Sequence, residues 1–175
     1  RHSAYAGSNS SCRSRGGMTL SAAAGIATLE VLKGERVIEN AARTGARLLR
    51  ALTQLVDQYE LVKEVRGKGL MIGVEFGSPS SLKLKASWNV LETASKGLFC
   101  QLITIPLFKE HKILTQVAGH GSHTVKLIPS LTIDDDDCAW IEEAFDEVIA
   151  ASHRVPGAVW SLGKTLIDHA IRPHA

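Results

Sequence analysis

The hydrophobic positions in the first third of the chain repeat with the period of an α-helix. Residues 18–33 are rich in alanine and leucine, which favour helices, and Gly34 ends the run. Residues 35–59 continue with apolar positions three and four apart, which form one stripe: Ala41, Gly45, Leu48, Leu52, Leu55 and Tyr59. We expect two long helices. The second should turn its stripe to a core, and the small residues of the first favour close packing against another helix or a neighbouring subunit.

A turn and a strand follow this second helix. Residues 66–69, Arg-Gly-Lys-Gly, predict a turn, because glycine allows positive φ and a close backbone approach. Residues 70–76 are apolar apart from Gly73 and Glu75 and predict a buried strand. The glycines resemble a dinucleotide fingerprint, but that motif needs a preceding strand and a helix that opens on the glycines. Because a strand leaves these glycines instead, the pattern argues against nucleotide binding.

The second half of the chain predicts shorter elements. A helix is expected over residues 83–98, followed by three strands over 98–107, 113–117 and 125–128. Four aspartates, residues 134–137, precede an apolar helical pattern, and we expect them to cap its free N–H groups and to interact with its dipole. Residues 158–170 have the pattern of a short last helix. The order of the elements predicts an α+β domain with helices on one face of a mostly antiparallel sheet.

Composition adds few constraints. The chain has 45% apolar and 22% charged residues and a net charge of +2, which is ordinary for a globular protein and gives no field that would attract nucleic acid or a membrane. Three cysteines, Cys12, Cys100 and Cys138, are far apart and outside CxxC pairs, so they fit a reducing, cytoplasmic compartment. No apolar run approaches the roughly 18 residues of a spanning helix or forms a signal-peptide core near the start, so we expect neither a spanning segment nor a signal peptide.

Candidate chemistry from the residues alone is sparse. His120 and His123 in a glycine-rich turn, with His111 nearby, have the only metal-like spacing, but zinc needs three or four ligands. A loop at the mouth of a binding site is the favoured interpretation, and a metal site is a distant alternative. Lys96, in Ala-Ser-Lys-Gly, resembles the short lysine motif of some Schiff-base enzymes, although an exposed lysine at a helix C-terminus is the simpler interpretation.

Three blocks of the sequence resemble the C-terminal part of class III (ornithine/GABA-type) pyridoxal-phosphate aminotransferases. Residues 16–30 are similar to the segment T-F-G-G-N-P-L-A-x-A-A-x-x-A-T-L-E of that family. Residues 65–75 match V-R-G-x-G-L-M-x-G-x-E, and residues 126–133 match R-x-x-P-P-L-x-I. The blocks are in order, and the resemblance runs from about Ser14 to His153. Residues 106–121 are further similar to proteins described broadly as of the aspartate aminotransferase family.

The resemblance implies a fold and a domain organisation. Such enzymes are fold-type I dimers that use pyridoxal phosphate to move an amino group from an amino donor to an oxo acid or aldehyde acceptor. In this chain it implies a polar arm or remnant of a preceding large domain over residues 1–17 and linking helices over 18–59. The C-terminal small domain would cover 60–153, and a tail would cover 154–175.

The resemblance also implies two site residues. Ser14 falls where the family has a threonine that contacts the cofactor phosphate of the neighbouring subunit, although Arg15 and Met18 depart from the pattern beside it. An alternative register places that block on residues 2–9. Lys126 falls where the family has an arginine that grips a substrate carboxylate, and it keeps the charge without the two-pronged geometry.

The Schiff-base lysine of the family lies upstream of the first block, so we expect no catalytic residue in this chain. We also expect no metal ligand, because two or three histidines without further support are too few for zinc. Lys96 follows the central strand and is in the wrong order to replace that lysine. The chain is therefore expected to be inactive alone, as a partner of a missing N-terminal large domain in a homodimer. The alternative is a non-catalytic, truncated homologue that acts as an interaction domain through exposed faces such as residues 18–33.

Overall fold

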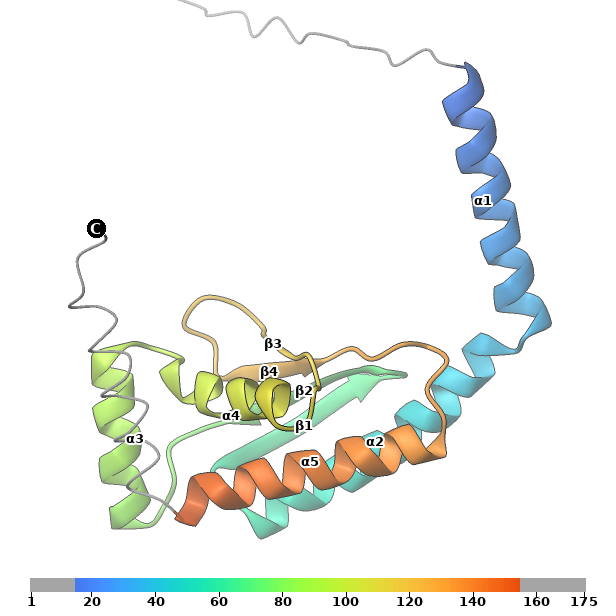
Figure 1. Ribbon diagram of the computed structural model, residues 1–175. Coiled ribbons are helices and arrows are strands. Elements are labelled where there is room, and N and C mark those ends of the chain that lie inside the picture. The colour runs from blue at the N-terminus through green and yellow to red at the C-terminus, as the bar shows by residue number, and fades with distance from the viewer. Residues whose placement is uncertain (1–14, 155–175) are drawn as a thin grey trace, which may run out of the picture. The chain divides into compact units, whose positions relative to one another are not determined.

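The computed structural model describes residues 15–154, which belong to two compact units that divide between Val37 and Ile38 (Figure 1). The first unit contains helix α1 (Arg15–Gly34). From Thr19 onward, every side chain of α1 except that of Leu32 is exposed. The expected close packing of its small residues against a further helix or subunit therefore stays a prediction.

The second unit is an α+β domain built on a four-stranded sheet. Its elements follow in this order: α2 (Val37–Gln58), β1 (Val62–Lys68), β2 (Met71–Phe76), α3 (Leu82–Ala94), α4 (Leu98–Lys109), β3 (Gln116–Val117), β4 (Thr124–Leu127) and α5 (Asp135–Arg154). The strand order is β1-β2-β4-β3, and each neighbouring pair is antiparallel. The expected fold class is confirmed. None of the helices in residues 15–154 is long and apolar enough to cross a membrane.

One face of the sheet is buried by helices. Along β2, Ile72, Val74 and Phe76 are buried, and along β4, Val125 and Leu127 are buried. These side chains belong to one hydrophobic core together with the apolar faces of α2, α4 and α5. Because side chains alternate along a strand, the intervening positions point to the opposite face of the sheet.

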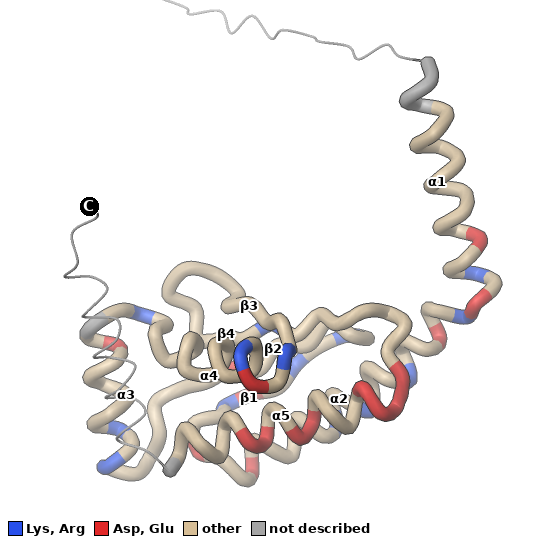
Figure 2. The backbone as a smooth tube through the Cα atoms, in the orientation of Figure 1, with Lys and Arg blue, Asp and Glu red and all other residues tan. Residues whose placement is uncertain are grey.

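Helices α2 and α5 run side by side and parallel beneath the sheet (Figure 1). Near their starts, Arg43 and Arg47 of α2 pair with Asp135 of α5, at 2.7 and 3.2 Å. Directly after α2, the hydroxyl of Tyr59 donates to Asp146, in the second half of α5, at 2.8 Å. Figure 2 shows the acidic residues gathered at the start of α5. These contacts fix the axial register of the two helices.

The aspartate run caps α5, as the sequence predicts. A carboxylate oxygen of Asp134 accepts the backbone N–H groups of Asp136 and Asp137 at 3.0 and 2.9 Å, and Asp137 accepts the N–H of Asp134 at 3.2 Å. This reciprocal arrangement is a capping box. Asp135 has a different role, since the hydrogen bonds from Arg43 and Arg47 lower the pKa of its carboxyl group.

The turn between β1 and β2 packs directly on α2. A methyl group on Gly45 would overlap the backbone of Gly69, and Gly69 itself has a φ of 56°. A methyl group on Gly67 would lie 2.5 Å from the carbonyl oxygen of Met71. The sequence predicts positive φ and close backbone approach at these glycines, and both occur: Gly69 has the positive φ, and Gly67 has the close approach.

Two sequence-based elements are wrong. Residues 66–68 do not belong to a turn but to β1, which pairs along its length with β2, so the turn is confined to Gly69 and Leu70. The strand was missed because Lys63, Glu64, Arg66 and Lys68 are exposed on it, and its short apolar pattern offers little periodicity.

The strand expected over residues 98–107 is helix α4 instead. Its buried residues, Phe99, Cys100, Ile103 and Leu107, have helical spacing and face the core, so burial overrides the strand preference of the β-branched residues. Pro106 lies in the last turn of α4, where only the final part of the helix has to accommodate it.

The remaining boundaries differ less. α1 begins at Arg15, inside the expected polar arm; α3 ends at Ala94; and the strand expected over residues 113–117 is reduced to Gln116–Val117. The helix expected over residues 158–170 lies outside the described residues, as do residues 1–14.

The contact between Gly45 and Gly69 leads to a first prediction. We expect Gly45→Ala to lower the free energy of unfolding by about 1–3 kcal/mol, because α2 must shift from the turn to admit the methyl group. Urea unfolding followed by circular dichroism measures the change. Gly25→Ala in α1 is the control, since nothing lies within 4 Å of the added methyl group. If Gly45→Ala were as stable as the wild type, Gly45 and the backbone of Gly69 would not be in close contact.

The α2–α5 ion pairs lead to a prediction on pH. Because the pKa of Asp135 is lowered in the folded state, its contribution to stability is present above the usual aspartate pKa of roughly 4 and is lost as the pH falls through the lowered value. We expect Asp135→Asn to flatten the acid side of the stability profile, measured as urea midpoints across pH. Asp136→Asn, on the neighbouring residue outside these pairs, should follow the wild type. If the urea midpoints of the wild type and Asp135→Asn changed with pH in the same way, the ion pairs of Asp135 would not be the cause of the acid dependence.

Candidate functional site

The face of the sheet opposite the core carries the charged side chains of the strands. We call it the open face, and it consists of alternate strand positions: Glu64, Arg66, Lys68, Met71, Gly73, Glu75, Gln116, Thr124 and Lys126. Met71, for example, is 64% exposed, whereas its neighbour Ile72 is 1% exposed. The burial of the alternate positions against the helices thus decides which residues are available to a ligand or another domain.

A single row crosses the open face from one edge to the other. Arg66 of β1 is opposite Gly73 of β2, Gly73 is opposite Lys126 of β4, and Lys126 is opposite Gln116 of β3. Gly73 has no side chain, so the middle of the row carries no charge, and the methyl group of Thr124 lies 3.1 Å from the place that a Cβ of Gly73 would take. The row therefore places two cationic residues, Arg66 and Lys126, on either side of an uncharged position.

The two cations of this row differ in their partners. Arg66 pairs with Glu64 at 2.9 Å and makes a second, short contact with Glu75. The hydrogen bond to Glu75 is the main cause that raises the pKa of Arg66. Two carboxylates thus neutralise this guanidinium, which leaves little of its charge for a ligand.

Lys126 is the cation that remains open to a ligand. Its side chain is half-buried in the centre of the open face, and within residues 15–154 no carboxylate lies within ion-pairing distance of its ammonium group. An ammonium is a compact charge with three donors, which suits a carboxylate or a phosphate oxygen. The exposed amide of Gln116 lies opposite it on β3. Lys126 was a candidate from the sequence. That Gly73 and Gln116 lie beside it became visible only from the pairing of the strands.

The three histidines do not converge. The Nε2 atom of His123 lies 2.7 Å from a carboxylate oxygen of Glu92, and that of His111 lies 3.6 Å from one of Glu147. His120 is exposed. Among the described residues, no three histidine, cysteine or acidic side chains are placed to share a metal ion.

The His123–Glu92 pair has a structural role. The other carboxylate oxygen of Glu92 accepts the N–H of Gly97 at 3.2 Å, and the ring of His123 lies 5.3 Å from that of Trp88. Gly97, with a φ of 79°, starts α4. The pair therefore ties the loop before β4 to the junction of α3 and α4.

The described cysteines and Lys96 are poor nucleophile candidates. Cys100 is buried, and burial raises the pKa of its thiol to about 12. Burial also raises the pKa of Cys138. Because the thiolate is the reactive form, neither thiol is activated. Lys96 is exposed between α3 and α4, which agrees with the simpler of the two sequence interpretations.

The pyridoxal phosphate that the sequence resemblance implies does not fit a site made of the described residues alone. A Schiff-base lysine acts from a site that excludes water. Of the lysines in residues 15–154, Lys126 is half-buried and the others are exposed. The expected phosphate contact, Ser14, lies outside the described residues. No catalytic step is therefore assigned to these residues.

Known proteins resemble this chain in both sequence and structure. The sequence model of Aminotransferase class-III matches residues 9–149. The chain is 34% identical over 131 residues to alanine–glyoxylate aminotransferase 2 homolog 2 of Arabidopsis thaliana, and the match covers 75% of this chain and 25% of the relative. It is 34% identical over 140 residues to diaminobutyrate–2-oxoglutarate aminotransferase of Rhizobium meliloti, covering 79% of this chain and 28% of that protein.

Solved structures agree with these sequence matches. An amine transaminase from an uncultivated Pseudomonas species, solved with bound PLP, superimposes with a TM-score of 0.58 at 28% identity and covers 74% of this chain and 27% of that one. The ornithine δ-aminotransferase of Plasmodium falciparum gives a TM-score of 0.54 at 29% identity, covering 71% and 27%. The chain spans about a quarter of the length of these proteins. The resemblance seen in the three sequence blocks is confirmed, and the chain belongs to the class III aminotransferases.

Proposed function

We propose that this chain is the C-terminal part of a pyridoxal-phosphate-dependent aminotransferase that transfers an amino group between an amino donor and an oxo acid or aldehyde. The observation that carries the proposal is the class III match over residues 9–149, together with structural similarity to transaminases over about three quarters of the chain. The family implies pyridoxal phosphate as the cofactor of the full-length protein, where it supplies the electron sink for amino transfer.

In this proposal, Lys126 binds a substrate carboxylate on the open face. Its unpaired ammonium, Gly73 and the amide of Gln116 lie in one row. A lysine offers a point charge, whereas an arginine offers two parallel N–H bonds, so the orientation of the carboxylate is held less tightly here. A substrate with a second carboxylate is the class that such a charge would favour.

We further propose that this polypeptide does not transaminate by itself. The chain spans about a quarter of the length of its relatives, and no lysine among the described residues is buried. The Schiff-base lysine would belong to an N-terminal large domain. In the full-length homodimer, Ser14 would contact the cofactor phosphate of the neighbouring subunit.

A reducing, cytoplasmic location is part of the same proposal. Its support is that Cys100 and Cys138 are free and buried thiols in the structure. Buried thiols that are not joined in disulfides are usual in reducing compartments.

A second candidate function is a non-catalytic interaction domain. The observation that favours it is the exposure of apolar residues on α1, among them Leu20, Ile26 and Leu29. Exposed apolar side chains of this size are typical of contact surfaces. If the chain is an interaction domain, it binds a partner protein, and substitution of Lys126 does not change its affinity for a carboxylate.

A cofactor experiment tests the catalytic part of the proposal. We expect the purified chain with added pyridoxal phosphate to show the absorbance of the free aldehyde, and borohydride reduction followed by peptide mapping to find no stoichiometric adduct on one lysine. Lys96→Ala is the matched control, because Lys96 lies in the only motif that resembles a Schiff-base lysine. A single reduced adduct that disappears in one lysine variant would overturn the proposal.

A binding experiment tests the role of Lys126. We expect Lys126→Ala to weaken binding of glutarate to the chain by about fivefold, since a partly exposed charge pair contributes about 1 kcal/mol. NMR titration that follows the amide of Gly73 reports the affinity at the site. Lys126→Arg should bind at least as tightly as the wild type, and Lys68→Ala, at the end of β1, should leave binding unchanged. An unchanged dissociation constant for Lys126→Ala would exclude this role.

A further inference from the structure

The loop between β3 and β4, residues 118–123, is held to the sheet at both of its ends. At its start, the N–H of Ala118 donates to the carbonyl of Thr124 at 2.8 Å. At its end, the carbonyl of His123 accepts the N–H of Phe76 of β2, also at 2.8 Å. The middle of this β3–β4 loop is not part of the sheet, so its position depends on contacts with other elements.

The middle of the loop lies on the junction between α3 and α4, residues 95–97. A Cβ on Gly97 would lie 3.0 Å from the carbonyl oxygen of Ser122, and one on Gly121 would lie 3.6 Å from the Cβ of Lys96. The Sγ atom of Cys100 lies 3.7 Å from the same Ser122 carbonyl. The loop and the junction therefore meet closely, largely through their backbones.

One charged contact joins the loop to α3. The Nε2 atom of His123 lies 2.7 Å from one carboxylate oxygen of Glu92, whose side chain is only 18% exposed. Within residues 15–154, no other basic side chain lies within ion-pairing distance of Glu92. A carboxylate with so little access to water is costly unless it is paired. The charged form of His123 is the partner that the fold places there.

The other ionisable groups near this contact have different surroundings. Burial, and then the charge of Glu92, raise the pKa of Cys100 to about 12, so this thiol stays neutral at physiological pH. Lys96 and His120 are exposed. Glu75 of the neighbouring strand β2 pairs with Arg66 on the open face. A change of charge on His123, which is usual for histidine between roughly pH 5 and 8, thus acts directly on the contact.

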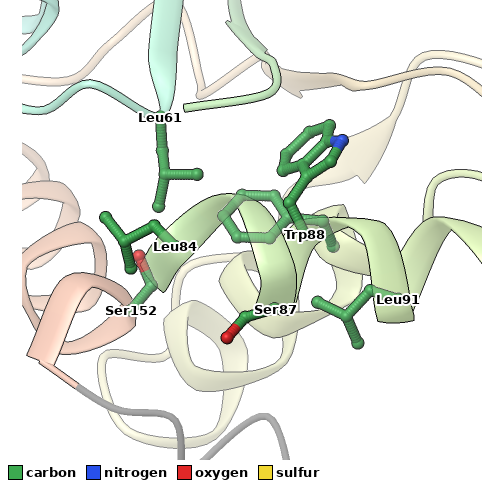
Figure 3. Close-up of a pocket in the computed structure, with 7 residues that line it drawn as sticks. Leu61, Leu84, Ser87, Trp88, Leu91 and Ser152 are labelled. Carbon is green, nitrogen blue, oxygen red and sulfur yellow. The ribbon is translucent and has the colours of Figure 1, made fainter. Parts of the chain in front are cut away.

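Helix α3 is held in place by the core as well as by this contact. Leu84, Trp88 and Leu91 of α3 surround a small apolar pocket together with residues of the neighbouring elements (Figure 3). Trp88 is 7% exposed and Leu91 4%, and the ring of Trp88 lies 4.9 Å from that of Phe99 of α4. Because apolar burial does not change with pH, a weaker contact with Glu92 should release the loop and leave α3 in place.

We propose that His123 is a pH-dependent switch, whose charged form holds the β3–β4 loop on the α3–α4 junction through Glu92. A charge-assisted hydrogen bond is about twice as strong as a neutral one, so the loop opens more often as the pH rises and the imidazole becomes neutral. Lys126 follows His123 by three residues, so the switch acts on the start of the strand that carries it. The inference does not rest on the proposed aminotransferase function, because loop opening is measured without a ligand.

Amide hydrogen exchange of the full chain, followed by NMR, tests the proposal. The N–H of Ala118 reports on the loop, that of Gly97 on the bond to Glu92, and that of Lys85, which donates to Ser81, on α3. We expect protection of Ala118 and Gly97, corrected for the intrinsic effect of pH, to fall about fivefold from roughly pH 5.5 to 8. Protection of Lys85 should stay within about twofold. Constant protection of the loop, or an equal loss at Lys85, would overturn the proposal.

Conservative variants assign the effect to this pair. His123→Gln and Glu92→Gln keep a hydrogen-bonding amide but remove one of the two charges, so we expect loop protection that no longer changes between these pH values. His120→Gln is the matched control, because His120 is an exposed histidine of the same loop, and it should follow the wild type. A fivefold loss that persists in His123→Gln, or disappears in His120→Gln, would contradict the assignment.

The unsubstituted chain gives a second result that does not depend on the folding of a variant. The ¹⁵N shifts of the imidazole of His123 report its protonation directly. We expect protection of the loop to be lost with the same pH midpoint as this protonation. Two midpoints that differ by one pH unit or more would overturn the proposal.

Discussion

Helix α2 approaches the β1–β2 turn so closely that Gly45 has no room for a side chain, and much of the second unit depends on this contact. The backbone of Gly69 fills the space that a methyl group would occupy, while its own positive φ lets β2 return along β1. The contact places α2 under the sheet, where its apolar stripe meets the buried face of β2. The ion pairs from Arg43 and Arg47 to Asp135 then hold α5 beside α2.

This arrangement decides the chemistry that the chain can offer. Once one face of an antiparallel sheet is buried, the alternation of side chains forces the other set of positions outward. Arg66 and Lys126 thus share a row on the open face, with Gly73 between them. The two carboxylates that pair with Arg66 neutralise its charge, so within this row Lys126 is the cation available to an anion.

The fold also separates the residues that the sequence suggested as catalytic or metal-binding candidates. The candidate residues from the sequence lie apart from one another. His123 connects a loop to α3 through Glu92, Cys100 is buried in the core, and Lys96 is exposed to solvent. An aminotransferase site needs an enclosed lysine and a phosphate cradle. Among the described residues no lysine is enclosed, and the chain spans about a quarter of the length of its relatives.

Local patterns in the sequence were sufficient for features that depend on neighbouring residues. The stripe of α2, the aspartate cap of α5, most of the strand expected over residues 70–76 and the family blocks are all of this kind, since period, capping and motif act over a few residues. Tertiary structure decided the rest. Residues 98–109 are a helix because burial of Phe99, Ile103 and Leu107 outweighs their local strand preference, and β1 exists because β2 supplies its hydrogen-bond partner. The row through Gly73 and Gln116, likewise, is set by pairing between strands far apart in the chain, which no local pattern encodes.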